Sequence, residues 1–216
     1  MLIRPLLFIY LLSASIFVSG QQKTDTSQID FPNMTIPESI REGVEEALAF
    51  YPELHNTAID FVFKDKIKHS YMQAQPRWYG MFQGKKKRRY IIKVSSFFDL
   101  SSGDVPVEQL PREILVGWIG HELGHILDYV DRSAFGMMGF GISYVTSKKK
   151  MIEAENRADI IAIKHGLGDY ILSCKEYVLE SELFSKEYRD RIHEHYMSPE
   201  EVVEWIEATS GVVSTK

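Results

Sequence analysis

Residues 111–130 place the strongest constraint on the fold, because their apolar side chains recur at the three- and four-residue spacing of an α-helix. The segment reads PREILVGWIGHELGHILDYV, which predicts one long helix with a face turned toward a core. Gly117, Gly120 and Gly124 follow each other at helical spacing. A glycine inside a helix costs about 1 kcal/mol relative to alanine, so three of them need a compensating contact. We expect another backbone to approach this strip closely, either that of a packed helix or that of a bound substrate.

The same helix carries two histidines and an acidic neighbour. His121 and His125 are four residues apart, so their side chains project from one helical face, one turn apart. Two imidazoles in that relation can bind one Zn²⁺ through ring nitrogens at about 2.0–2.1 Å. Glu122 can reach the open side of such a metal without ligating it, where it would take a proton from water. The alternative is a core helix whose histidines pair with carboxylates, which leaves Glu122 and the glycines unexplained.

A catalytic zinc site needs a third ligand, and the sequence offers two candidates. Glu155 lies four residues before Asp159 on a second apparent helix, so one carboxylate can bind the metal while the other holds a ligating imidazole. Asp131 would need a sharp turn at Asp128, where zinc enzymes of the turn type have glycine. The helical pattern continues through residues 126–130, which favours Glu155. The plain alternative for Glu155 is a solvated charge on a helix surface.

The order of the predicted elements indicates an α+β fold. Residues 37–51 have helical periodicity, and a proline at position 37 suits a first turn. Three β-like segments follow, over residues 58–63, 69–73 and 89–95, and from residue 111 onward the pattern is mostly helical. Helix, then sheet, then helices is typical of an α+β domain. We therefore expect a single domain over residues 29–216, with a small mixed sheet packed on the helix that carries the histidines.

The first twenty residues have the layout of a secretory signal peptide. A short positive start through Arg4 precedes the apolar run PLLFIYLLSASIFV, and small residues lead to Gly20 before a polar stretch. We expect cleavage near Gly20, a flexible start over residues 21–28, and a secreted or periplasmic protein. The alternative is an uncleaved anchor that holds the protein outside the cytoplasm, although the run is short for about 30 Å of hydrocarbon.

Composition narrows the class of partner. Acidic residues number 30 and basic residues 25, for a net charge of −5, whereas proteins that bind nucleic acid carry an excess of Lys and Arg. Cys174 is the single cysteine, which excludes an intramolecular disulfide and a cysteine-rich metal site. The expected partner is a peptide or protein substrate, and membrane contact is compatible with the sequence without being required.

Three further segments have structural interpretations. The basic run KKKRR over residues 85–89 predicts a solvated hairpin turn after Gly84, with contact to an anionic surface as the alternative. The apolar, glycine-rich run FGMMGFGISY over residues 135–144 is interpreted as a buried connection between the two zinc helices. Its alternatives are the lining of a substrate pocket and contact with a membrane. Ser198 and Glu201 predict a capping box that opens a last helix.

The two motifs together resemble the gluzincin group of zinc metallopeptidases, whose familiar member is thermolysin. The matching strings are His121-Glu122-Leu123-Gly124-His125 and Glu155-x-x-x-Asp159. The size and the Glu-Asn-Arg-Ala-Asp string are similar to prenyl-protein endopeptidase-like and heat-shock-membrane-protease-like branches, and to the small single-domain minigluzincins. The resemblance covers residues 90–168. It implies a zincin-like fold in which an edge strand pairs with the substrate backbone. It also implies that His121, His125 and Glu155 are zinc ligands, that Glu122 is the general base and acid, and that Asp159 orients a ligand.

The sequence departs from this group in two respects. It shows none of the transmembrane helices of the two membrane branches, and it has no readily matched downstream residue for stabilising the oxyanion. Spacing singles out none of the available candidates, which are His165, His193, His195, Tyr144 and Tyr170.

The expected function is that of a secreted zinc-dependent endopeptidase that hydrolyses peptide bonds with one zinc ion per chain. Two alternatives remain at this level. One is a zinc-dependent hydrolase of a non-peptide amide or ester, and the other is a zincin-like module that binds peptides without turnover.

Overall fold

The computed structural model describes residues 31–68, 70–80, 82, 84–100 and 103–213. The predicted signal peptide over residues 1–20 and the predicted flexible start over residues 21–28 lie outside these ranges, so both stay predictions. Within the described ranges, no helix combines the length and the apolar character that crossing a membrane requires.

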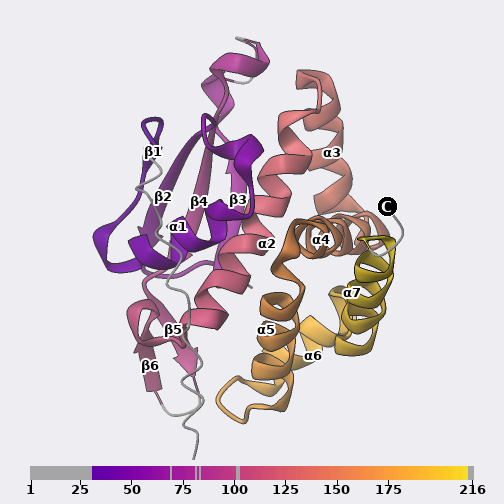
Figure 1. Cartoon of the computed structure of the whole chain (residues 1–216). Coiled ribbons are helices and arrows are strands. Elements are labelled where there is room, and N and C mark those ends of the chain that lie inside the picture. Colours follow the sequence, from indigo (N-terminus) through magenta and orange to yellow (C-terminus); the bar gives the residue numbers. More distant parts are fainter. Residues whose placement is uncertain (1–30, 69, 81, 83, 101–102, 214–216) are drawn as a thin grey trace, which may run out of the picture. The chain divides into compact units, whose positions relative to one another are not determined.

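The described part combines a small mixed sheet with many helices (Figure 1). The strands are β1 (Met34–Thr35), β2 (Ala58–Lys64), β3 (Met72–Pro76), β4 (Arg89–Ser95), β5 (Phe97–Leu100) and β6 (Gly103–Pro106). The α-helices are α1 (Arg41–Ala49), α2 (Arg112–Val130), α3 (Ala134–Thr146), α4 (Lys148–Ala162), α5 (Gly168–Glu180), α6 (Lys186–His195) and α7 (Pro199–Val213). The main sheet has the order β1-β2-β4-β3, with β1, β2 and β4 parallel and β3 antiparallel at the edge. This architecture confirms the predicted α+β class.

Helix α2 lies between the sheet and the later helices (Figure 1). It contacts α1 and β3 on one side and α4 and α5 on the other. Its apolar residues face the core, where Val116, Ile119 and Leu123 have no exposed surface. The helix therefore provides the frame on which the sheet and the C-terminal helices meet.

The glycine strip of α2 explains how closely those later helices approach. A Cβ placed on Gly117 would lie 2.5 Å from the carbonyl oxygen of Tyr170 in α5, and one on Gly124 would lie 2.6 Å from that of Ala158 in α4. Real Cβ atoms do not come that close to backbone oxygens, so only glycine permits this packing. The expected close approach is confirmed, and its partner is a packed helix.

The predicted strands are partly confirmed. Strands β2 and β4 match the predicted segments to within one residue, and in β4 the alternate residues Tyr90, Ile92 and Val94 are buried. The segment predicted over residues 69–73 is shifted, since β3 begins at Met72. Strand β1 and the hairpin of β5 and β6 were not predicted, because their short pairings depend on neighbours distant from any local periodicity.

The structure contradicts the prediction for residues 135–144. It forms most of helix α3, in which only Met137 is buried, so the interpretation as a buried connection is wrong. Helix α3 packs on α4 through one side, and several of its apolar side chains project away from the protein. Local apolar content does not determine burial here, because no described element covers the outer face of this helix.

The prediction for the basic run is confirmed in part. Its first residues lie in the connection between the antiparallel strands β3 and β4, where Gly84 has a φ of 90°, a single 3₁₀ turn follows, and Lys85 and Lys87 are exposed. Arg88, however, is buried, and Arg89 already belongs to β4. A second structural prediction is confirmed. The capping box is present, since the Glu201 amide donates to Ser198 Oγ at 3.3 Å and the Ser198 amide donates to Glu201 Oε2 at 2.8 Å.

Candidate metal centre

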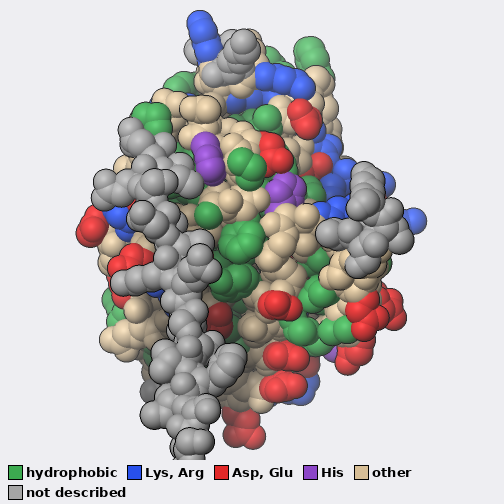
Figure 2. Space-filling model, in the orientation of Figure 1, with side chains coloured by type: hydrophobic (Ala, Val, Ile, Leu, Met, Phe, Trp, Pro, Cys, Tyr) green, Lys and Arg blue, Asp and Glu red, His purple; other side chains and the backbone are tan. Residues whose placement is uncertain are grey.

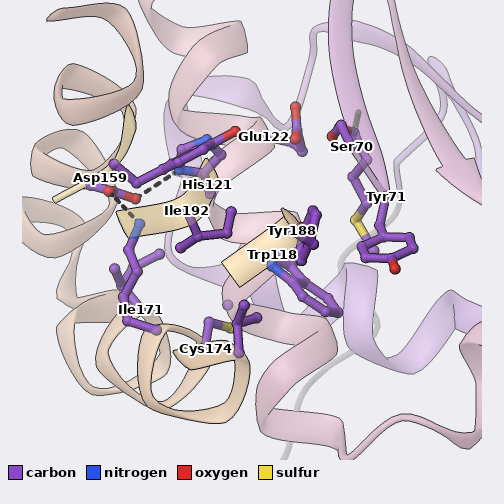
Figure 3. Close-up of a pocket in the computed structure, with 15 residues that line it drawn as sticks. Ser70, Tyr71, Trp118, His121, Glu122, Asp159, Ile171, Cys174, Tyr188 and Ile192 are labelled. Atoms are coloured by element: carbon purple, nitrogen blue, oxygen red, sulfur yellow. Dashed lines mark hydrogen bonds and ion pairs between the residues drawn. The ribbon is translucent and has the colours of Figure 1, made fainter. Parts of the chain in front are cut away.

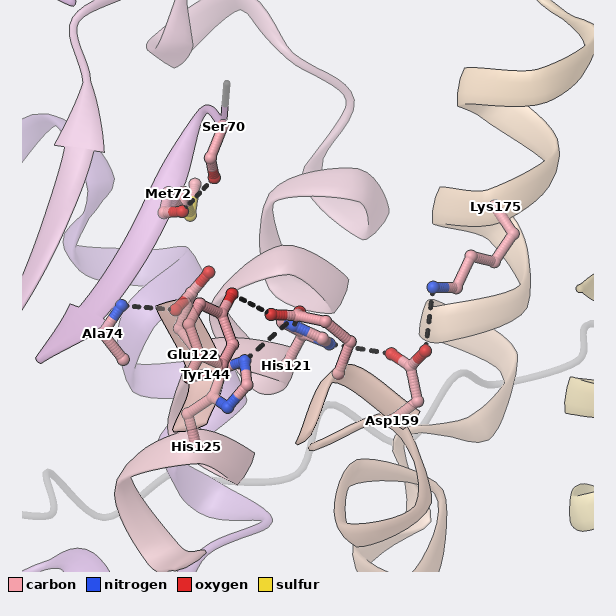
Figure 4. A network of polar contacts seen from close by, with 10 residues as sticks. Ser70, Met72, Ala74, His121, Glu122, His125, Tyr144, Asp159 and Lys175 are labelled. Carbon is pink, nitrogen blue, oxygen red and sulfur yellow. Dashed lines mark hydrogen bonds and ion pairs between the residues drawn. The ribbon is translucent and has the colours of Figure 1, made fainter. Parts of the chain in front are cut away.

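Helices α2 and α4 bring two imidazoles and one carboxylate together in the interior. The Nε2 atoms of His121 and His125 lie 3.1 Å and 3.4 Å from the same oxygen, Oε2 of Glu155. All three side chains are buried. Figure 4 shows His121 and His125 on α2, with Tyr144 and Asp159 beside them. Among the described residues they form the group of potential metal ligands that lies close enough to hold one ion.

The three ligand atoms lie within 4.8 Å of one another, and two of their separations are close to those expected around one metal ion. With metal–ligand distances of about 2.0–2.1 Å and tetrahedral angles, two ligand atoms lie about 3.4 Å apart. The distances of 3.1 Å and 3.4 Å to Glu155 Oε2 are close to that value. The donor set of two imidazole nitrogens and one carboxylate oxygen is also one that catalytic zinc sites use. The residues present therefore fit a metal ion.

A second carboxylate holds His121 from behind. Asp159 Oδ1 lies 2.7 Å from His121 Nδ1, one helical turn after Glu155 on α4. Because an ionised carboxylate can only accept, Nδ1 donates its proton to Asp159, and Nε2 is the ring nitrogen that faces Glu155 and is available to a metal ion. The expected orienting role of Asp159 thus has the required geometry.

Lys175 on α5 completes this arrangement and was not identified from the sequence. Its ammonium lies 2.8 Å from Asp159 Oδ2 and 4.7 Å from the ring centroid of Tyr196, and the side chain is buried. One signal could have found it, because Lys175 shares the buried stripe of α5 with Ile171, Cys174 and Val178. A lysine on the apolar stripe of a helix indicates a buried anionic partner.

Tyr144 is a third contact of the site and is partly buried. Its hydroxyl, which α3 supplies, donates a hydrogen bond to Glu155 Oε1, so the two carboxylate oxygens of Glu155 have different partners. Burial, followed by the charge of Glu155, raises the pKa of the Tyr144 phenol far above its usual value. The phenol therefore keeps its proton and can act as a donor.

Glu122 lies beside the ligand group without belonging to it. Its Oε2 accepts a hydrogen bond of 2.6 Å from the backbone N–H of Ala74 in β3, which directs the carboxylate toward the sheet (Figure 4). Burial raises the pKa of Glu122, while the neighbouring imidazoles act in the opposite direction. A carboxylate with a raised pKa is better suited to accept and return a proton.

The charges of the site favour a cation between the histidines and Glu155. Burial alone would lower the pKa of His121, but Asp159 and Glu155 raise it to about 10. Burial would likewise raise the pKa of Glu155, but His125 and His121 hold it well below its usual range. A positive charge between Nε2 and Glu155 is thus stabilised, whether a proton or a metal ion carries it.

The buried charges also balance with a divalent ion. The carboxylates of Glu122, Glu155 and Asp159 are buried, and Lys175 supplies one buried ammonium among them. Two negative charges are then left over, which is costly in the interior of a protein unless a cation compensates them. A divalent metal would neutralise the group.

A small cavity opens beside His121 and Glu122. It has a volume of about 50 Å³ and lies between α2, the start of β3 and the C-terminal helices (Figure 3). Its walls are largely aromatic and aliphatic, from Tyr71, Trp118, Ile171, Val178, Tyr188 and Ile192. A space of this size can hold water or a small aliphatic group next to the candidate metal position.

The alternative third ligand is not part of the group. Asp131 is an exposed residue at the C-terminal end of α2, where its carbonyl accepts a hydrogen bond of 2.6 Å from Lys85. Asp128, at the position where a turn would have been needed, forms an ion pair of 2.6 Å with Arg132. The helix continues past the turn position, which agrees with the choice of Glu155.

The five candidates for a residue that stabilises the oxyanion differ in whether they contact the site. Only Tyr144 contacts a residue of the site. The hydroxyl of Tyr170 donates to Glu46, His165 stacks on Tyr51, and His195 Nδ1 bonds the carbonyl of Arg191. His193 is exposed on α6.

A scan against protein-family models found no match, and neither did searches of the curated proteins and of the solved structures.

Proposed function

We propose that this protein is a zinc-dependent endopeptidase of the gluzincin type, acting after export from the cytoplasm. The observation that carries the proposal is the position of Glu122 next to, and outside, a buried group of three potential metal ligands. His121, His125 and Glu155 would hold the ion, and their separations of 3.1 Å and 3.4 Å suit zinc. When bound there, zinc would lower the pKa of a water molecule to about 7 and polarise a carbonyl group.

Glu122 is the proposed general base and acid. Its carboxylate would take the proton of the attacking water and return it to the leaving amine. The hydrogen bond from the Ala74 amide fixes one carboxylate oxygen at 2.6 Å, so the other can be directed at the reacting atoms. The raised pKa of Glu122 supports both halves of this proton transfer.

Strand β3 is the proposed binding edge for the substrate backbone. It pairs with β4 through one side only, and it is the last strand of its sheet. The Ala74 amide points from the opposite side toward Glu122, so the unpaired edge borders the candidate metal centre. An extended peptide added along this edge would bring its carbonyl groups past the general base.

The test is the substitution Glu122→Gln, compared with Glu113→Gln in the first turn of the same helix. Glutamine cannot take the proton, so we expect zinc content to be retained and proteolysis to fall by about 10²–10⁴-fold. Glu113 is exposed and outside the site, so its variant should match the wild type. Unfolded casein and mixed peptides serve as substrates, with cleavage followed by mass spectrometry and zinc measured by atomic emission.

His121→Ala completes the series, because loss of a primary ligand should remove zinc and activity together. Equal cleavage by Glu122→Gln and the wild type, with zinc present, would falsify the peptidase proposal. A wild type that binds zinc and peptides but cleaves no bond would instead indicate a binding module.

A further inference from the structure

Helix α3 presents an apolar stripe to its surroundings. Phe135 and Val145 are each 79 % exposed, Ile142 is 62 % exposed and Met138 is 36 % exposed. Steps of three, four and three residues place these side chains on one helical face. The opposite face carries Tyr144, which reaches Glu155. The helix has no charged residue and is apolar on both sides, so a large apolar face remains on the outside, which is unusual for a protein surface.

The glycines of α3 support the same interpretation. A Cβ placed on Gly139 or Gly141 would meet no atom within 4 Å, so no packing requirement accounts for either residue. Each costs the helix about 1 kcal/mol in water relative to alanine. A helix weakened in this way would be stabilised by another surface that covers its apolar face.

A loop with exposed aromatic residues lies next to the start of α3. Trp78, Tyr79 and Phe82 are 73 %, 72 % and 65 % exposed in the connection between β3 and β4. The same connection is tied to the junction of α2 and α3, since Lys85 donates to the Asp131 carbonyl. Arg88 likewise donates to the Arg132 carbonyl at 2.6 Å. Figure 1 shows this loop and the α2–α3 junction at the same end of the molecule.

Basic residues flank the apolar surface at both ends. Lys85 and Lys87 are exposed near the first residues of α3, and no described carboxylate lies within ion-pair distance of either. Lysines at positions 148–150 are exposed just after its last residue, although Lys148 and Lys150 pair with Glu194 and Glu153. Figure 2 shows Lys and Arg side chains gathered toward the upper end of this view, with acidic side chains more frequent below.

We propose that α3 and the described residues of the loop between β3 and β4, which are 77–80, 82 and 84–88, form a docking surface for a lipid bilayer with anionic headgroups. Exposed Trp, Tyr and Phe side chains favour the interface between water and lipid, and lysines favour anionic headgroups. The exposed face of α3 would insert into this interface, and the charges that flank it come from the loop and from the lysines after its last residue. A second copy of the chain is a poorer occupant, because it would bring basic residues against basic residues.

Docking would place α3, and with it the Tyr144 side of the metal centre, at the membrane. This inference does not rest on the proposed peptidase function, because lipid binding and peptide cleavage are measured separately. If the protein is an enzyme, docking through this surface would favour substrates that lie at the membrane.

The first experiment measures binding of the full chain to vesicles by flotation, with phosphatidylcholine alone or with about 30 % phosphatidylserine. We expect anionic lipid to raise the partition coefficient by about tenfold or more, with the gain reduced by high salt. The triple change Phe135→Ser, Ile142→Ser and Val145→Ser should lower it by about tenfold or more. The matched control is Phe97→Ser, an exposed aromatic residue on β5.

Charge is tested with Lys85→Glu combined with Lys87→Glu, which should lower partition into anionic vesicles by about tenfold or more. Lys66→Glu, at a lysine exposed elsewhere, is the control and should change partition little. All of these residues are exposed, so the variants should fold, and circular dichroism checks that they do.

The second experiment locates the contact. The fluorescence of the chain is measured with vesicles whose acyl chains carry bromine, which quenches tryptophan at the bilayer. Trp78 should account for the quenching, so Trp78→Phe should remove it, whereas Trp205→Phe should not. Quenching of Trp78 distinguishes the outcomes even if residues 1–20 bind lipid themselves, because it reports contact between the loop and the bilayer.

The proposal is overturned by either of two results. One is equal partition of wild type and triple variant together with quenching that Trp78→Phe does not change. The other is a dimer in solution, measured by light scattering, that the triple variant dissociates and that does not bind anionic vesicles. Binding of a protein partner to α3 in the absence of lipid, without binding of the chain to anionic vesicles, would also overturn the proposal.

Discussion

Lys175 Nζ lies 2.8 Å from Asp159 Oδ2, and both side chains are buried where α4 and α5 pack. The other oxygen of Asp159 receives the Nδ1 proton of His121, so one carboxylate joins a buried ammonium to a candidate zinc ligand. Burial would raise the pKa of Asp159, but Lys175 and His121 lower it below its usual value. Asp159 therefore stays ionised and holds the imidazole in one tautomer.

Removing one partner of this buried pair should be costly. Lys175→Met leaves the Asp159 carboxylate without its ammonium, and breaking such a pair costs about 3–5 kcal/mol of unfolding free energy. The double variant with Asp159→Asn should cost less than the sum of the two single variants, because no unpaired charge remains. Urea unfolding of all three proteins measures this. Lys186→Met is the control, since Lys186 pairs with Asp190 in solvent and should contribute less than about 1 kcal/mol.

The third ligand is tested by its metal content. Glu155→Ala should strip zinc from the purified protein, whereas Asp131→Ala should retain about one zinc per chain, because Asp131 is exposed and lies outside the ligand group. Zinc that is lost from Asp131→Ala and kept by Glu155→Ala would reverse the assignment. Chelation of the wild type should also lower its melting temperature, since a ligand that binds only the folded state stabilises it.

Tyr144 should affect zinc affinity through Glu155. Tyr144→Phe removes the hydrogen bond to Glu155 Oε1, and we expect zinc affinity to fall by about 10–100-fold. Competition with a chromophoric chelator measures the affinity. Tyr170→Phe is the matched control, because its hydroxyl bonds Glu46 away from the ligands. Unchanged affinity in Tyr144→Phe would show that the phenol does not position the carboxylate.

The glycine strip is tested by comparing two alanine substitutions. Gly124→Ala would bring a Cβ to 2.6 Å from the Ala158 carbonyl oxygen, so α4 must shift together with Glu155 and Asp159. We expect a loss of about 1–3 kcal/mol in unfolding free energy and weaker zinc binding. Gly139→Ala in α3 meets open space and should be neutral or stabilising by up to about 1 kcal/mol. Equal effects of the two substitutions in chemical denaturation would contradict the packing argument.

Local periodicity accounts for the parts of the fold that could be predicted. Helix α2 and strands β2 and β4 repeat their apolar residues at intervals that one element imposes on itself. The positions of His121, Glu122 and His125 follow from the helix alone, because four residues make about one turn. Pairings between distant segments, such as β1 with β2, leave no such local pattern.

The residue types and spacing of the candidate metal centre follow from the amino-acid sequence, which also predicts Glu155 and Asp159 as partners one turn apart. Tertiary structure decided the rest, because burial and charge pairing depend on which helices meet. It brought Lys175 from α5 to Asp159 and Tyr144 from α3 to Glu155, and it directed the Ala74 amide to Glu122. It also left the apolar face of α3 exposed, where composition had indicated a buried segment, because apolar residues are buried only where another element packs on them.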